Sequence, residues 1–147
     1  MLRLSTPNHK RILQSESFDV NYGGAEANVA IAVCNYGLEG VFVSKLPENQ
    51  IGQSAINHLR KFGVDTRHVL RGGERMGVYY VESGASIRSS QVIYDRKDSS
   101  FATAAASEFD FEKILEGADW FHVSGITPAI SAQAALMAEA EIGRAHV

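Results

Sequence analysis

Hydrophobic and polar residues follow two different periods along the chain. Apolar residues recur at helical spacing in residues 25–36 and 52–62, and glycines end both segments, which predicts two helices. Between them, the apolar run at 41–44 predicts a short buried strand. A helix, a strand and a helix in this order indicate an α/β fold with a mainly parallel central sheet and flanking helices.

The middle of the chain changes to short strands separated by glycine-containing turns. Three strands are expected there, at residues 66–71, 77–82 and 91–96. They suggest a small antiparallel sheet inserted into the α/β core. A weaker alternation at 18–21 predicts one further strand before the first helix.

The last part of the chain returns to helical patterns. It predicts, in order, a short helix, a buried strand and a helix, at residues 110–117, 120–124 and 131–140. Asp110 and Ser131 are suited to cap the two helices. Residues 141–147 continue no pattern, so we expect one domain at 1–140 followed by a non-native tail at 141–147.

Composition and charge narrow the classes of function. The 147 residues carry a formal net charge of −3, which gives no electrostatic reason to expect nucleic acid or an anionic membrane as a partner. The longest hydrophobic run has six residues, whereas a membrane span needs roughly 20. Cys34 is the single cysteine, which excludes an internal disulfide and fits a cytoplasmic setting. The five histidines lack metal-ligand spacing, so no metal site is expected.

The start of the first predicted helix is the strongest candidate for ligand binding. It has the sequence Gly23-Gly24-Ala25-Glu26-Ala27-Asn28. Two glycines at a helix start let a ligand approach the backbone and leave N–H donors free. The amide of Asn28 offers both donors and an acceptor, which suits sugar hydroxyls. A loop-to-helix junction with a tolerated asparagine explains the same residues equally well.

A second candidate group comes from the predicted strands of the middle segment. Tyr94 and Arg96 are two residues apart and share one face of a strand, and Tyr79 on a neighbouring strand can join them. An arginine fork matches a carboxylate, and tyrosine hydroxyls orient sugar oxygens. The alternative is a surface strand on which Arg96 pairs with Asp95 or Asp98.

These motifs resemble the ribokinase-like (PfkB) carbohydrate kinases, and the Gly-Gly-Ala-Glu-Ala-Asn version is most similar to the 2-keto-3-deoxygluconate kinases. The resemblance runs from about residue 2 to about residue 140. The other matching stretches, collinear with the first, are Lys45-Leu46-Pro47, Gly63-Val64-Asp65-Thr66, Gly77-Val78-Tyr79-Tyr80, Tyr94-Asp95-Arg96 and Ser124-Gly125-Ile126-Thr127-Pro128-Ala129.

The resemblance implies a ribokinase-like fold with a β-sheet lid at about 66–97, and ATP-dependent phosphorylation of 2-keto-3-deoxygluconate to its 6-phosphate. It implies substrate binding by Gly23, Gly24, Asn28, Tyr79, Tyr94 and Arg96. It also implies a homo-oligomer formed through the lid. A fructokinase or ribokinase activity, or a catalytically inactive binding-only fragment, remain the alternatives.

The family's catalytic motif is Gly-Ala-Gly-Asp, and none of the six aspartates follows a Gly-x-Gly here. We therefore expect no catalytic residue in this chain, and an N-terminal half that binds substrate. The catalytic Asp and most of the contacts to ATP and Mg²⁺ are expected in a missing C-terminal half. The family's opening strand is likewise expected to be cut off before Met1.

Overall fold

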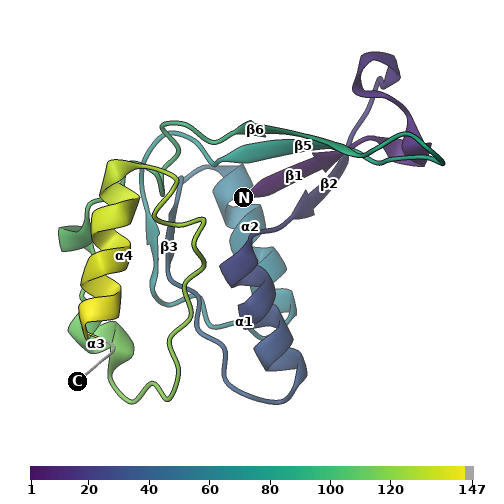
Figure 1. Cartoon of the computed structure of the whole chain (residues 1–147). Helices are drawn as coiled ribbons and strands as arrows, with labels where there is room; N and C mark the ends of the chain where they lie inside the picture. Colours follow the sequence, from purple (N-terminus) through teal and green to yellow (C-terminus); the bar gives the residue numbers. More distant parts are fainter. Residues whose placement is uncertain (145–147) are drawn as a thin grey trace.

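The computed structural model describes residues 1–144, which form two sheets flanked by helices (Figure 1). The strands are β1 (Leu2–Ser5), β2 (Asp19–Tyr22), β3 (Ser44–Leu46), β4 (Val69–Arg71), β5 (Val78–Glu82) and β6 (Gln91–Asp95). The α-helices are α1 (Ala25–Asn35), α2 (Gln50–Lys61), α3 (Phe111–Leu115) and α4 (Ala132–Arg144). Three short 3₁₀ helices lie at Pro7–His9, Ile12–Gln14 and Ala106–Glu108. The predicted α/β class is confirmed.

The core is built around the parallel pair of β3 and β4, which lies between two groups of helices (Figure 1). Phe42 packs on the side of α1 and α2, against buried Leu59 and Val64. Val43 and Leu70 pack on the other side, in a cluster that contains residues of α3 and α4. The helices predicted at 25–36 and 52–62 are confirmed as α1 and α2.

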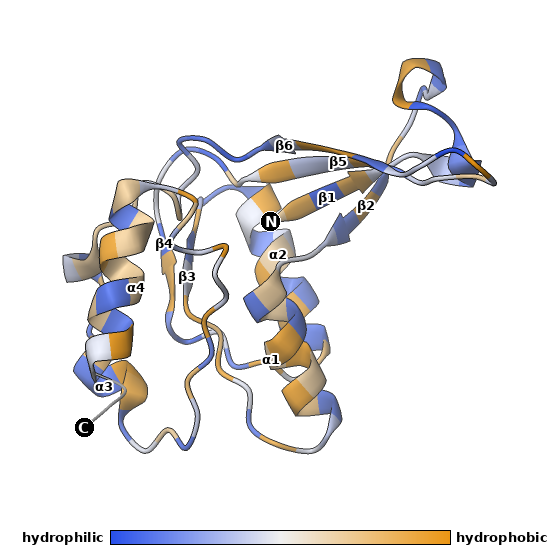
Figure 2. Cartoon of the chain, viewed as in Figure 1, coloured by the Kyte–Doolittle hydropathy of each residue, from blue (hydrophilic) through white to orange (hydrophobic). Residues whose placement is uncertain are grey.

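The lid is a four-stranded sheet with the order β2-β1-β5-β6. The lid differs from the predicted antiparallel sheet in two respects. First, β4 is not part of it, because the strand predicted at 66–71 pairs in parallel with β3 in the core. Second, both β1 and β2 join it, with β1 parallel to β5 and antiparallel to β2. In Figure 2 hydrophobic and hydrophilic residues alternate along β1, as expected of a strand with one face on the core.

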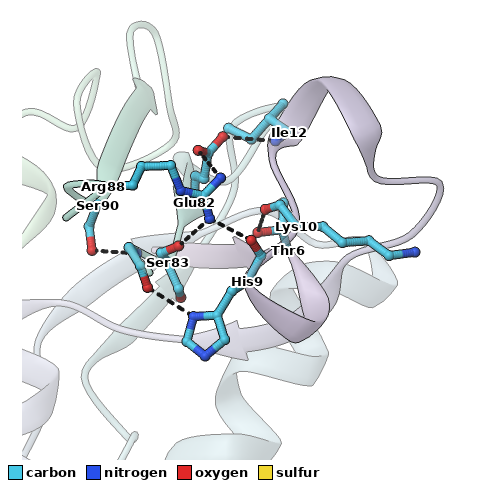
Figure 3. Close-up of polar contacts among 9 residues, drawn as sticks. Thr6, His9, Lys10, Ile12, Glu82, Ser83, Arg88 and Ser90 are labelled. Carbon is cyan, nitrogen blue, oxygen red and sulfur yellow. Dashed lines mark hydrogen bonds and ion pairs between the residues drawn. The ribbon is translucent and has the colours of Figure 1, made fainter. Parts of the chain in front are cut away.

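The end of the lid farthest from the helices is fixed by a polar network (Figure 3). The carboxylate of Glu82 is buried; it pairs with Arg88 at 3.2 Å and accepts a hydrogen bond from the backbone N–H of Ile12 at 2.9 Å. His9 Nδ1 donates to the carbonyl oxygen of Gly84 at 2.9 Å. These contacts tie the loop after β1 to the turn between β5 and β6.

The prediction of a strand at residues 120–124 is wrong. These residues are irregular and Trp120 is 93% exposed, because within residues 1–144 no strand lies beside them to complete a ladder. The helix predicted at 131–140 is confirmed as α4, and the Ser131 hydroxyl accepts from the N–H of Ala134 at 3.0 Å. The helix continues through Arg144, into the expected tail; residues 145–147 lie outside the described part.

Within the described residues no helix is long and apolar enough to cross a membrane.

Candidate substrate site

The Gly-Gly turn joins the lid to α1. Gly24 is the N-cap of α1 and has φ of +156°, a backbone conformation that residues other than glycine rarely adopt. Gly23 lies against the lid, since a Cβ atom placed there would come within 2.5 Å of the Tyr79 hydroxyl oxygen. The geometry therefore favours glycine at both positions: at Gly24 because of its backbone angle, and at Gly23 because of its close contact with Tyr79.

The lid brings Tyr79, Tyr94 and Arg96 together as their spacing predicts. Tyr79 and Tyr94 are directly paired between β5 and β6, and their rings stack with centroids 6.0 Å apart. The Arg96 guanidinium lies 4.7 Å from the centroid of the Tyr94 ring, at the range of a cation–π contact. We call these three side chains the lid cluster.

Arg96 does not form the ion pairs that the alternative interpretation requires. Asp95 instead pairs with Arg75 at 2.8 Å. Within the described part of the chain, no carboxylate pairs with Arg96. Its guanidinium therefore keeps its donors available for an added anion.

Asn28 belongs to α1 and not to the lid cluster. It lies in the first turn of α1, where its backbone N–H donates to the carbonyl oxygen of Gly24 at 2.9 Å. Its residue is exposed, and in residues 1–144 its side chain forms no hydrogen bond. The structure thus joins Gly23 to the lid cluster and leaves Asn28 facing solvent, one helical turn beyond Gly24.

Two neighbours of the site were not found from the sequence. Arg3 on β1 is paired with Tyr79 of β5 and with Asn21 of β2, so its side chain shares the face of Tyr79 and Tyr94. The sequence did not predict β1, because the alternation of hydrophobic and polar residues there spans only four positions. The second is Glu26, whose partners are about 100 residues away along the chain.

The carboxylate of Glu26 binds the segment before α4. Its Oε1 atom accepts hydrogen bonds from the N–H of Ser124 (3.1 Å), the hydroxyl of Ser124 (2.6 Å) and the hydroxyl of Thr127 (2.7 Å). Burial raises the pKa of Glu26, but these hydrogen bonds outweigh it and the pKa is lowered. Burial and the nearby charge of Glu26 raise the pKa of Glu141 on α4 to about 7.

A hollow of about 1560 Å³ is lined by α1, by residues 37–46, by the inner end of the lid and by the segment from α3 to α4. Among its lining residues are Gly24, Glu26, Arg96, Ile126 and Thr127. The start of α1 and the inner end of the lid therefore open onto the same space. Among the described residues, no group of three or more His, Cys, Asp or Glu side chains could hold a metal ion.

Comparison with known families identifies the class. The model of the pfkB family of carbohydrate kinases matches residues 2–147, so the chain belongs to this family. It is 40% identical over 131 residues to the 2-dehydro-3-deoxygalactonokinase of Haloferax volcanii, covering 89% of this chain and 41% of that protein. It is 32% identical over 118 residues to the 2-dehydro-3-deoxygluconokinase of Bacillus subtilis, covering 80% of this chain and 36% of that protein.

The solved structures agree. The 2-dehydro-3-deoxygluconokinase of Thermotoga maritima superposes with a TM-score of 0.97 and 54% identity, covering 99% of this chain and 45% of that one. The resemblance inferred from the motifs and the ribokinase-like fold are thereby confirmed. The chain spans less than half the length of each of these relatives.

Proposed function

We propose that this chain is the substrate-binding part of an ATP-dependent kinase that phosphorylates 2-keto-3-deoxygluconate, also called 2-dehydro-3-deoxygluconate, to its 6-phosphate. The observation that carries the proposal is the lid cluster. Arg96, which has no carboxylate partner in the described residues, lies over the ring of Tyr94, and Tyr94 stacks on Tyr79 beside the Gly-Gly turn. The names of the relatives support a sugar acid as the substrate.

In this proposal the lid cluster binds the acid end of the substrate. The Arg96 guanidinium donates two parallel hydrogen bonds to the carboxylate, a geometry that a neutral sugar cannot use. The hydroxyls of Tyr79 and Tyr94 orient the neighbouring oxygens. The backbone at Gly23 and Gly24 and the amide of Asn28 bind the substrate's hydroxyls.

Phosphoryl transfer itself needs groups that this part of the chain does not offer. The terminal hydroxyl must lose a proton to a base as it attacks the γ-phosphate of ATP, while Mg²⁺ neutralises the phosphate charge. We propose that the base, an Asp, and most contacts to ATP and Mg²⁺ come from a further part of the protein. The 147 residues alone then bind the sugar acid without phosphorylating it.

The relative from Haloferax volcanii favours a second candidate substrate, 2-dehydro-3-deoxygalactonate. The two sugar acids differ in the configuration of one hydroxyl, and both present the same carboxylate to Arg96. A fructokinase or ribokinase activity is the third candidate, and it would leave the guanidinium of Arg96 without an anionic ligand.

A panel of acceptors at fixed ATP tests the proposal in the whole protein. The panel contains 2-keto-3-deoxygluconate, 2-keto-3-deoxygalactonate, fructose and ribose, and kcat/KM is measured for each. We expect the gluconate to have the highest value and both acids to exceed the neutral sugars. A neutral sugar ranked first would refute the sugar-acid assignment. Calorimetry on the 147-residue chain should show binding of the acid and no turnover.

A further inference from the structure

Glu26 connects two segments that both line the hollow, the start of α1 and the segment before α4. It is the second residue of α1, and all three of its hydrogen bonds reach one oxygen atom, Oε1, from Ser124 and Thr127. A carboxylate is acceptor-only and suits this arrangement, because every partner is a donor. Its negative charge is also favourable at a helix N-terminus.

The Gly-Gly turn is held on its strand side by Gly23, whose N–H donates to the carbonyl oxygen of Met1 at 3.0 Å and whose carbonyl oxygen accepts from the Met1 amino group at 2.8 Å. On its helix side, Glu26 is the side chain that attaches it to another segment. Gly23 and Gly24 have no side chains. Gly24 has a positive φ, and glycine adopts positive and negative φ about equally, so its backbone angle must be set by the surrounding structure. On the helix side, the turn is continued only by the backbone of the first turn of α1, where Asn28 donates to Gly24. Glu26 lies between these two residues and anchors that turn.

The partner segment belongs to the same space as the turn. Ile126 and Thr127 line the hollow together with Gly24 and Arg96. Thr127 is buried, so its hydrogen bond to Glu26 is shielded from water, and such a bond to a charged group is stronger than one at the surface. The same bonds that fix the helix start therefore also fix one wall of the hollow.

We propose that Glu26 is a positioning residue for the sugar-acid site, which sets the Gly-Gly turn and the 124–127 segment at a fixed separation. The inference rests on the proposed function. It assigns Ser124 and Thr127 to the support of the substrate site through Glu26. A residue that merely stabilised the fold would alter the melting temperature without raising KM for the sugar acid.

Hydrogen exchange tests the attachment without any assay of activity. In the 147-residue chain the backbone amide of Ser124 donates to Glu26. Glu26→Ala should therefore speed hydrogen exchange at Ser124 by tenfold or more, the factor that corresponds to the loss of one hydrogen bond to a charged group. Glu26→Gln keeps one acceptor oxygen and should give a smaller increase. Unchanged exchange at Ser124 in Glu26→Ala would show that the attachment does not hold the segment, and would overturn the proposal.

Kinetics of the whole protein test positioning. Glu26→Ala is expected to raise KM for the sugar acid about tenfold, with Glu26→Gln between it and wild type and with KM for ATP unchanged. Thr127→Val should raise KM for the acid in wild type and add little in Glu26→Ala, because both changes remove the same bond. Equal KM for the acid in wild type and Glu26→Ala would overturn the proposal.

Glu82→Gln is the matched control. Glu82 is also buried and accepts from a backbone N–H, but it lies in the network at the far end of the lid (Figure 3). This variant should melt at a lower temperature and keep KM for the acid; a rise equal to that of Glu26→Ala would overturn the inference. Failure of wild type to phosphorylate any sugar acid would instead refute the proposed function, and the inference with it.

Discussion

Arg96 lies over the ring of Tyr94 at 4.7 Å, with no carboxylate paired to it in the described residues. We expect Arg96→Ala in the whole protein to raise KM for the sugar acid by about ten- to a hundredfold, equivalent to the roughly 1.5–3 kcal/mol of a charged hydrogen bond. KM for a neutral sugar should change less than threefold. Steady-state kinetics on both substrates measure the difference.

Arg11→Ala is a suitable comparison for Arg96→Ala. Arg11 is also an arginine, but it is exposed in the loop after β1 and does not line the hollow. This variant should match wild type in both assays. Equal losses for acid and neutral sugar in Arg96→Ala would contradict the assignment of Arg96 to the carboxylate.

Glu141 makes the stability of this chain depend on pH. Burial and the charge of Glu26 raise its pKa from 4.5 to about 7, so the folded state retains a proton that the unfolded state releases between these values. The contribution of Glu141 to the free energy of unfolding should therefore fall as pH rises from about 4.5 to about 7. Glu141→Gln removes this cost, and we expect it to raise the melting temperature by a few degrees at pH 8 and hardly at all at pH 4.

Thermal melts of the 147-residue chain at these two pH values measure the effect of Glu141→Gln. Glu139→Gln is the control, because Glu139 lies on the same helix and is exposed. The same gain at pH 4 and pH 8 would show that the substitution acts through packing, and that the raised pKa of Glu141 has no part in it.

Among the elements, those with a local signal were predictable from the sequence. Apolar spacing and terminal glycines located α1 and α2 to within two residues. Partners of strands were not predictable in the same way, because pairing depends on segments far apart in the chain. β4 was assigned to the lid although it pairs with β3, and residues 120–124 were assigned to a strand that has no neighbour in the described residues.

The same distinction applies to the site. The two-residue spacing of Tyr94 and Arg96 predicted a shared face, and the pairing of Tyr79 with Tyr94 has that geometry. Glu26 and Ser124 are 98 residues apart in the sequence, and no local sequence pattern predicts their contact. The motif that contains Glu26 could be recognised from the sequence. The hydrogen-bond partners of the Glu26 carboxylate could be identified only from the fold.

The contact of the lid with the start of α1 leads to a prediction at the level of elements. Gly23→Ala places a Cβ atom 2.5 Å from the Tyr79 hydroxyl oxygen and 3.6 Å from the ring carbon that carries it. The lid must then shift, and we expect a loss of about 1–3 kcal/mol in the free energy of unfolding, as is usual for overpacking. Adding Tyr79→Phe removes the nearest atom and should recover most of this loss.

Urea unfolding of the wild-type chain, of Gly23→Ala, of Tyr79→Phe and of the double variant measures the coupling between the two positions. Strict additivity of the two single changes would contradict a direct contact between the turn and the lid. The prediction concerns stability alone, so it holds whatever the substrate.

For the molecule as a whole, the two faces of the lid have different surroundings. Leu4 is paired with Val20 on one side and Tyr80 on the other, and Tyr80 is paired with Ile93, so these four side chains share the face opposite to Tyr79 and Tyr94. Val20 and Ile93 are 61% and 51% exposed. Leu4 packs against the core, so the exposed apolar part of this face is at Val20 and Ile93, and exposed apolar side chains of this kind are typical of an interface with another protein chain.

We expect the homo-oligomer that the family resemblance implies to form through this face of the lid, which would leave the face of the lid cluster free for substrate. Ile93→Lys places a charge in the interface, and a buried unpaired charge is costly, so we expect the oligomer to dissociate to monomer. Light scattering coupled to size-exclusion chromatography on the whole protein measures the mass. Val92→Lys is the control, because Val92 is the preceding residue of β6, is 45% exposed and points to the other face. If both lysine variants keep the mass of wild type, the lid face is not the interface. If only Ile93→Lys is monomeric, the subunits are joined through the face of the lid that carries Ile93.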